Sequence, residues 1–149
     1  MPTHDQLTAE FERMGIDAAA AARLARADLD GDVPQLVRHT LLFAAWRHIV
    51  DRAGAWIDGM VDSYPAGPPL RALLAAGADR AMVTQLVRAM QFEAVAGLVG
   101  ALDDGAAAPS SARWRLFEVD EHGQPTRAIH ALHESLTGAD PTGEADGWM

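Results

Sequence analysis

The spacing of apolar residues in the middle of the chain limits it to a largely helical fold. Leu36, Phe43, Val50 and Ile57 recur every seven residues. Two turns of an α-helix return to nearly the same side, so residues seven apart lie on one face. The pattern therefore predicts a long helix over residues 33–62 with one apolar side facing the core.

Two glycines interrupt this predicted helix. Gly54 and Gly59 each weaken a helix by up to ~1 kcal/mol relative to Ala, because glycine loses more backbone freedom on folding. We therefore expect close packing or a bend near them.

Helix-forming stretches fill most of the remaining chain. Asp17 precedes an Ala-rich run and has the side chain of a good N-cap. The further expected helices run from a cap at Thr3 or Asp5 to about Gly15, and over residues 17–29, 70–76 and 79–102. We predict a mainly α fold, a helical bundle of about four to five helices.

The C-terminal part has a different pattern. Residues 113–119 are rich in strand-forming side chains and are followed by the turn-forming sequence DEHG. Pro125 cannot donate a backbone hydrogen bond, so the returning strand must lie at an edge. We predict a small β-hairpin at about 113–129, one domain over 1–137, and a flexible acidic tail over 138–149.

Composition and charge exclude several classes of function. The chain has 149 residues, no cysteine and a formal net charge of −9. Without cysteine there is no disulfide or thiolate chemistry. Scattered arginines on an acidic chain disfavour nucleic acid and anionic membranes as partners. No stretch reaches the ~18 apolar residues that span a bilayer, and the N-terminal residues do not resemble a signal peptide. We expect a cytoplasmic, bacterial protein without a cofactor.

Histidines near the C-terminus form the sharpest candidate for chemistry. His130 and His133 are three residues apart and would share one face of a helix, with Glu134 beside them. This spacing can chelate zinc or another divalent metal. It is not the H-E-x-x-H arrangement of metalloproteases. The hypothesis is a small metal-binding protein or metal-dependent enzyme; the alternative is that these side chains are polar caps.

Acidic side chains form a second candidate site. Asp51, Asp58 and Asp62 would share one side of the long helix, opposite its apolar face, and Glu93 lies within the helix at 79–102. A line of carboxylates favours a basic protein partner. The chain carries no recognisable nucleophile or phosphate-binding motif, and we assign no catalytic residues. The leading hypothesis is a non-enzymatic interaction module of the immunity, inhibitor or accessory type.

Self-association is a third possibility. Phe92, Val95 and Val99 form a second apolar stripe on the helix predicted over residues 79–102. Such a stripe could be the contact face of a homo-oligomeric structural protein.

The C-terminal motifs also carry a resemblance. They read Trp114-Arg-Leu-Phe-Glu-Val-Asp, Gly123-Gln-Pro-Thr, Ala131-Leu-His-Glu-Ser and Asp140-Pro-Thr-Gly-Glu. Together with Met90-Gln-Phe-Glu and Leu102-Asp-Asp, this block resembles one in a group of small proteins of GC-rich bacteria. The resemblance implies no activity and no catalytic residue. It implies that the hairpin and the tail form one unit.

Overall fold

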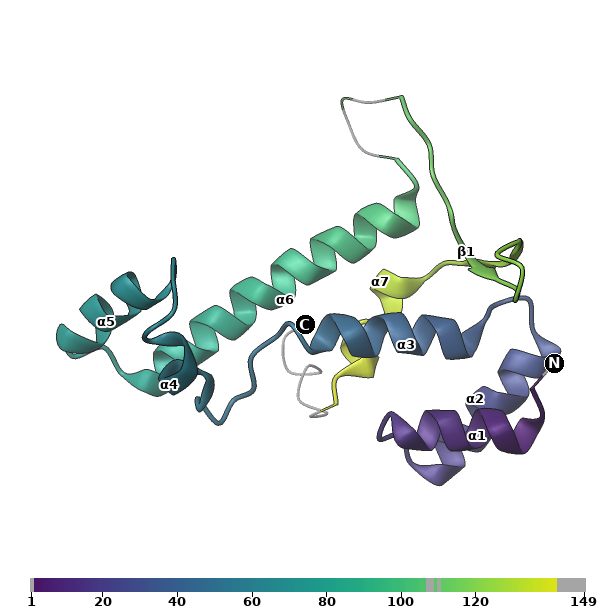
Figure 1. Ribbon diagram of the computed structural model, residues 1–149, viewed down its shortest axis with the longest axis horizontal. Coiled ribbons are helices and arrows are strands. Elements are labelled where there is room, and N and C mark those ends of the chain that lie inside the picture. Colours follow the sequence, from purple (N-terminus) through teal and green to yellow (C-terminus); the bar gives the residue numbers. More distant parts are fainter. Residues whose placement is uncertain (1, 107–108, 110, 142–149) are drawn as a thin grey trace. The chain divides into compact units, whose positions relative to one another are not determined.

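The protein is mainly α-helical with one small antiparallel β-hairpin near its C-terminus (Figure 1). The computed structural model describes residues 2–106, 109 and 111–141. The predicted fold class is therefore confirmed.

The chain divides into two compact units. The first unit combines Met1–Trp46 with Ala96–Met149, and the second unit is Arg47–Val95. The first unit contains the elements α1 (His4–Arg13), α2 (Ala18–Asp30), α3 (Gln35–Trp46), β1 (Leu116–Val119), β2 (Pro125–Ile129), α7 (Leu132–Ser135) and the 3₁₀ helix η1 (Thr137–Ala139). Those that begin in the second unit are α4 (Trp56–Met60), α5 (Gly67–Ala75) and α6 (Arg80–Asp104), whose last turns belong to the first unit.

Helices α1 and α2 begin at the caps that the sequence predicts. The Thr3 hydroxyl accepts from the backbone N–H of Gln6, and the Gln6 side chain accepts from Thr3 N, which completes a capping box. Asp17 accepts from two backbone N–H groups of α2. The two helices pack around a buried cluster, Leu7, Phe11, Ala21 and Ala25.

Helix α3 is joined to the C-terminal elements of the first unit. The indole Nε1 of Trp46 donates to the backbone oxygen of Leu136 at 2.8 Å. Leu42, Leu132 and Leu136 are buried. These contacts hold α7 and η1 against α3, as Figure 1 shows.

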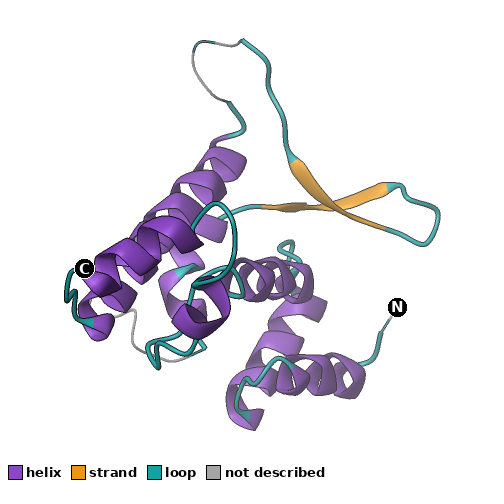
Figure 2. Cartoon of the chain, turned by 60° about the vertical axis from the view of Figure 1, so that its left-hand side comes forward, coloured by secondary structure: helices purple, strands orange, loops and turns teal. Residues whose placement is uncertain are grey.

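The hairpin lies where the sequence places it. Strand β1 pairs antiparallel with β2, with Leu116 opposite Ile129 and Phe117 opposite Ala128, and Figure 2 shows the two strands as a twisted ribbon. The register becomes irregular before Val119 pairs with Pro125. Of the predicted tail, Asp140 is buried, and residues 142–149 lie outside the described residues, so the flexibility of the tail stays a prediction.

The predicted long helix over residues 33–62 is wrong. Helix α3 ends at Trp46, and residues 47–55 form turns and irregular backbone before α4 begins. Gly54 lies in the left-handed region at φ +75°, and a Cβ added there would lie 3.2 Å from Thr84 Oγ1. The heptad pattern misled because both backbone groups of Val50, in the middle of this segment, bind side chains of α6 rather than groups within a helix.

The interruption of the helix at Gly54 predicts opposite effects for two glycine substitutions. Gly54→Ala should lower the free energy of unfolding by about 1–2 kcal/mol, because a side chain in the left-handed region is strained. Gly59→Ala should raise it by up to ~1 kcal/mol, since Gly59 lies inside α4 with open space around it. Urea denaturation of both variants measures the difference; equal effects would contradict the break at Gly54.

Candidate functional site

The inner side of α6 within the second unit is polar. Thr84, Arg88 and Gln91 follow one another at spacings of four and three, so they form one stripe. Thr84 is 2% exposed and Arg88 3% exposed. The Thr84 hydroxyl accepts from Trp56 Nε1 at 3.1 Å, which holds α4 against this side of α6.

The same stripe holds the irregular segment 47–55. Arg88 Nη1 donates to the backbone oxygen of Val50 at 2.7 Å, and the Gln91 side-chain oxygen accepts from the backbone nitrogen of Val50 at 2.9 Å. Both backbone groups of Val50 are therefore satisfied by α6. Buried backbone groups outside regular structure require such partners, which explains why the inner side of this helix is polar.

The outer side of α6 is apolar. Met82, Leu86 and Met90 are spaced by four residues, which places them on one stripe about half a turn from the inner one. They are 71%, 60% and 63% exposed, respectively. We call these three residues the outer stripe. An ordinary surface helix turns its large apolar side chains inward. Here Val83 and Val87 are partly buried beside the inner stripe, but the larger Met82, Leu86 and Met90 are exposed.

Three large apolar side chains in a row on a surface favour docking. Covering a Leu or Met side chain contributes about 1.5–3 kcal/mol relative to full exposure, and contiguous exposed apolar patches mark interaction sites more often than isolated residues do. Ala89 adds a small side chain to the same side of the helix. The outer stripe is the candidate protein-interaction surface of this chain.

The predicted acidic residues do not form one line. Asp51 lies in the irregular segment, Asp58 in α4, and Asp62 in the turn after α4. Asp58 pairs with Arg80 at 2.7 Å and Asp62 contacts Arg71 at 3.3 Å, so two of these carboxylates already face an arginine. The break between α3 and α4 removes the common helix face.

Two other residues of that set have different surroundings. Asp51 accepts a hydrogen bond from the backbone nitrogen of Ala53 within its own turn. Glu93 is exposed and lies on the outer side of α6, three residues beyond Met90. Glu93 is therefore the one member of the predicted acidic set that borders the outer stripe.

The predicted metal residues do not share a helix. Helix α7 begins only at Leu132, because Ala131 is left-handed at φ +58°, so His130 lies before the helix. The backbone nitrogen of His133 donates to an Asp103 carboxylate oxygen at 2.6 Å, and both His133 and Glu134 are exposed. Across the part of the chain that the structure describes, no group of three or more His, Asp or Glu side chains could hold a metal ion.

The apolar stripe predicted for self-association faces elsewhere. Val99 is buried, and Phe92 and Val95 are partly buried. The exposed apolar side of the helix is instead the one that carries Met82, Leu86 and Met90. Self-association through Phe92, Val95 and Val99 stays a prediction. Periodicity alone does not orient α6, because this helix has apolar residues all around it.

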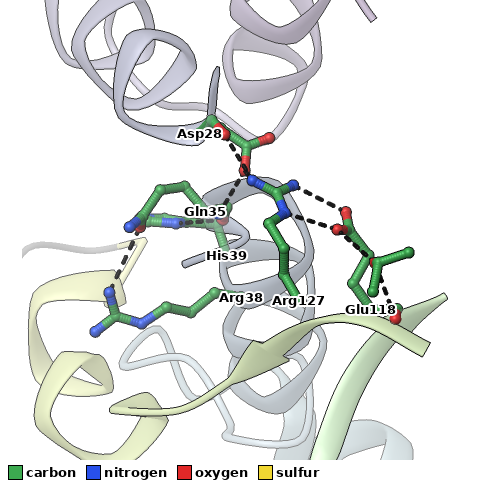
Figure 3. Close-up of polar contacts among 7 residues, drawn as sticks. Asp28, Gln35, Arg38, His39, Glu118 and Arg127 are labelled. Carbon is green, nitrogen blue, oxygen red and sulfur yellow. Dashed lines mark hydrogen bonds and ion pairs between the residues drawn. The ribbon is translucent and has the colours of Figure 1, made fainter. Parts of the chain in front are cut away.

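A polar network around Arg127 joins the hairpin to the helices of the first unit (Figure 3). The Arg127 guanidinium binds Glu118 with two nitrogens, Nε to Oε2 at 2.8 Å and Nη2 to Oε1 at 3.1 Å. Its Nη1 donates to the backbone oxygen of Asp28 at 2.6 Å and lies 3.1 Å from the Asp28 carboxylate. That carboxylate is buried and also accepts from the backbone nitrogen of Gln35 at 2.8 Å.

This network connects the two strands to α2 and α3, and we call it the Arg127 joint. Asp28 lies in the last turn of α2 and binds the first residue of α3, while Arg127 and Glu118 lie on the two strands. Arg38 adds a second link from α3, donating to the backbone oxygen of Ala131 at 2.6 Å and to Ser135. Hydrogen bonding to Arg127 lowers the pKa of Glu118, and the same pairing raises that of Arg127. These charges are directed at one another rather than at a ligand.

A cleft of about 500 Å³ lies beside His39 in the first unit. Its walls include Leu24 and Phe43, and its polar groups include Asp17 and Asp140. His39 Nδ1 lies 2.9 Å from the backbone oxygen of Gln35, and burial lowers the His39 pKa. Because a carbonyl oxygen only accepts, Nδ1 carries a proton and donates it to Gln35. Asp17 caps α2, and His39 bonds a backbone oxygen of its own helix, so both side chains have structural roles within the helices.

Comparisons with known proteins add no relative. No protein-family model, curated protein or solved structure matches the chain. Among the described residues, none of the helices combines the length and apolar character needed to cross a bilayer.

The Arg127 joint predicts a graded loss of stability. Arg127→Met should lower the free energy of unfolding by about 2–4 kcal/mol, because the buried Asp28 carboxylate loses its cationic partner. Arg127→Lys should cost less, since it keeps the charge and loses the two-nitrogen contact with Glu118. Chemical denaturation of the three proteins at neutral pH gives this order; unchanged stability of Arg127→Met would contradict it.

The lowered pKa of Glu118 predicts a specific acid sensitivity. A carboxyl whose folded-state pKa lies below its unfolded value of 4.5 stabilises the fold above that pH. This contribution is lost as pH falls below 4.5 toward the folded pKa. Stability measured from pH 6 to pH 3 should therefore fall more steeply in the natural chain than in Glu118→Gln. Parallel curves would show that the Arg127 contact does not shift this carboxyl.

Proposed function

We propose that this chain is a non-enzymatic protein-interaction module that docks through the outer stripe of α6. The observation that carries the proposal is the reversed polarity of this helix. Thr84 and Arg88 are buried, while Met82, Leu86 and Met90 are exposed. An arrangement of this kind is stable in water at little cost only when another surface covers the apolar side.

The charge distribution also supports an interaction through this unit. Residues 47–95 contain five acidic residues and five arginines, so the formal charge of −9 belongs to the other unit. A neutral surface with an apolar centre suits a partner that is itself apolar and uncharged there. The acidic first unit would keep the assembly soluble and repel non-specific contacts.

Methionine oxidation tests this proposal with an internal reference. Exposure alone orders the residues Met82, Met90 and then Met60, which is 37% exposed and lies in α4. If the outer stripe is covered in the cell, Met82 and Met90 should react more slowly than Met60 when untagged protein is oxidised in freshly broken cells. Rates are normalised to those of the unfolded chain, which corrects for intrinsic reactivity.

Two matched variants make the test specific. Leu86→Asp places a charge within the outer stripe and should restore fast oxidation of Met82 and Met90. Leu98→Asp changes the same residue type at similar exposure, 65%, on the same helix but about 120° around its axis. It should leave both methionines protected. Oxidation of the natural chain in the order Met82, Met90, Met60 would overturn the proposal.

A further inference from the structure

We infer that the partner at the outer stripe is an amphipathic helix of another protein, with a row of apolar side chains in its middle and a basic side chain beyond each end of that row. The inference rests on the proposed function and names the chemistry of the partner. It follows from the charges that border the outer stripe and from the spacing of the residues within it.

Two exposed carboxylates lie in line with the outer stripe, one beyond each end. Asp79 precedes Met82 by three residues, and Glu93 follows Met90 by three. At about 100° per residue, both carboxylates share one third of the helix circumference with the apolar side chains between them. This side of α6 is therefore apolar in its centre and acidic at both ends.

The two carboxylates are available to a partner. Among the residues of the second unit that the structure describes, neither Asp79 nor Glu93 forms an ion pair. Arg80, which follows Asp79 directly, is paired with Asp58 at 2.7 Å. The ends of the outer stripe thus stay acidic although the unit is neutral as a whole. A basic side chain opposite each end would speed association and fix the register of the partner.

The same charges disfavour a second copy of this chain as the partner. If two α6 helices packed antiparallel about Leu86, Asp79 of each copy would meet Glu93 of the other. In a parallel pair, each of these carboxylates would meet its own counterpart. Both directions bring like charges together, and such contacts select against a partner.

The spacing of the outer stripe favours a helix as the partner. Met82, Leu86 and Met90 follow one another at steps of four residues, so they form a ridge about 12 Å long. A second helix with apolar side chains at the same steps packs beside such a ridge, and the flexible methionines adapt to it.

The distance between the carboxylates limits how the partner crosses α6. Asp79 and Glu93 are 14 positions apart, which corresponds to about 21 Å along the helix axis. A partner helix reaches both ends most readily at the crossing angle of about 20° that is common in helical bundles. Because both ends are acidic, the charges fix the register of this helix and permit either direction.

Fluorescence anisotropy with synthetic peptides tests the inference. The probe is a labelled helical peptide of about 20 residues, with three leucines at steps of four and an arginine three residues beyond each outer leucine. A second peptide has glutamates in place of the arginines. The arginine peptide should bind the untagged chain at least about tenfold more tightly, and salt should weaken its binding. Equal affinities, or no binding of either peptide at about 1 mM, would overturn the inference.

Variants without the two carboxylates locate the effect on α6. Asp79→Asn combined with Glu93→Gln removes both charges, while asparagine still caps α6. This double variant should lose most of the preference for the arginine peptide. Glu12→Gln combined with Glu121→Gln removes as much charge from exposed positions on α1 and in the hairpin turn, and should keep the preference. An equal loss in both double variants would show that the peptide responds only to net charge, against the inference.

The inference and the proposed function fail in different ways. Leu86→Asp should weaken binding of the arginine peptide at least about tenfold, and Leu98→Asp should not change it. If the two peptides bind equally while Met82 and Met90 remain protected in broken cells, the basic partner helix is wrong and the proposed docking surface stands. If Met82 and Met90 oxidise fastest in cells, the proposed function itself is wrong.

Discussion

The irregular segment over residues 47–55 determines which side of α6 faces inward in the second unit. Here the chain leaves α3 and returns to helix only at α4, so backbone groups on this path need partners outside regular structure. Helix α6 supplies them at Val50, where Arg88 and Gln91 bind both backbone groups. Its Thr84 also accepts from the side chain of Trp56 in α4. Because these polar residues must face inward, the apolar residues on the opposite side of α6 face outward.

The first unit is built on a different interaction. There Arg127 connects the two strands to the last turn of α2, and its contact with the buried Asp28 carboxylate makes that connection specific. The hydrophobic cluster of α1 and α2 does not depend on a contact of this kind, because the residues that pack together in it are close in sequence. The acidic unit is thus a folded, charged body, and the neutral unit presents the apolar surface. The proposed interaction function depends on this division between the two units.

Local signals allowed much of the fold to be predicted. Thr3 and Asp17 cap helices as expected, because capping depends on a few neighbouring residues. Pro125 stands at the start of an edge strand, where its missing N–H is harmless. The α6 helix was also expected, since residues 79–102 contain no proline and their two glycines, Gly97 and Gly100, lie near the C-terminal end.

Long-range contacts account for what could not be predicted. The heptad pattern through Val50 and Ile57 suits a helix, yet hydrogen bonds to residues some 40 positions away stabilise another conformation there. For the same reason, the acidic residues at 51, 58 and 62 do not share a face. One signal was available for the outer stripe. Thr84, Arg88 and Gln91 lie on one side of α6, and such a polar stripe marks the side of a helix that binds other polar groups.

The central claim is that α6 turns Thr84 inward and Leu86 outward, and thiol reactivity measures this most directly. Cysteine at position 84 is close in shape to threonine, and cysteine at position 86 replaces an exposed side chain, so both variants should fold. In dilute, monomeric protein, we predict that Leu86→Cys reacts with a maleimide reagent at close to the rate of an unfolded chain, and Thr84→Cys far more slowly. A fast Thr84→Cys together with a slow Leu86→Cys would mean that the helix is turned by half a revolution, and the account of its outer surface would be wrong.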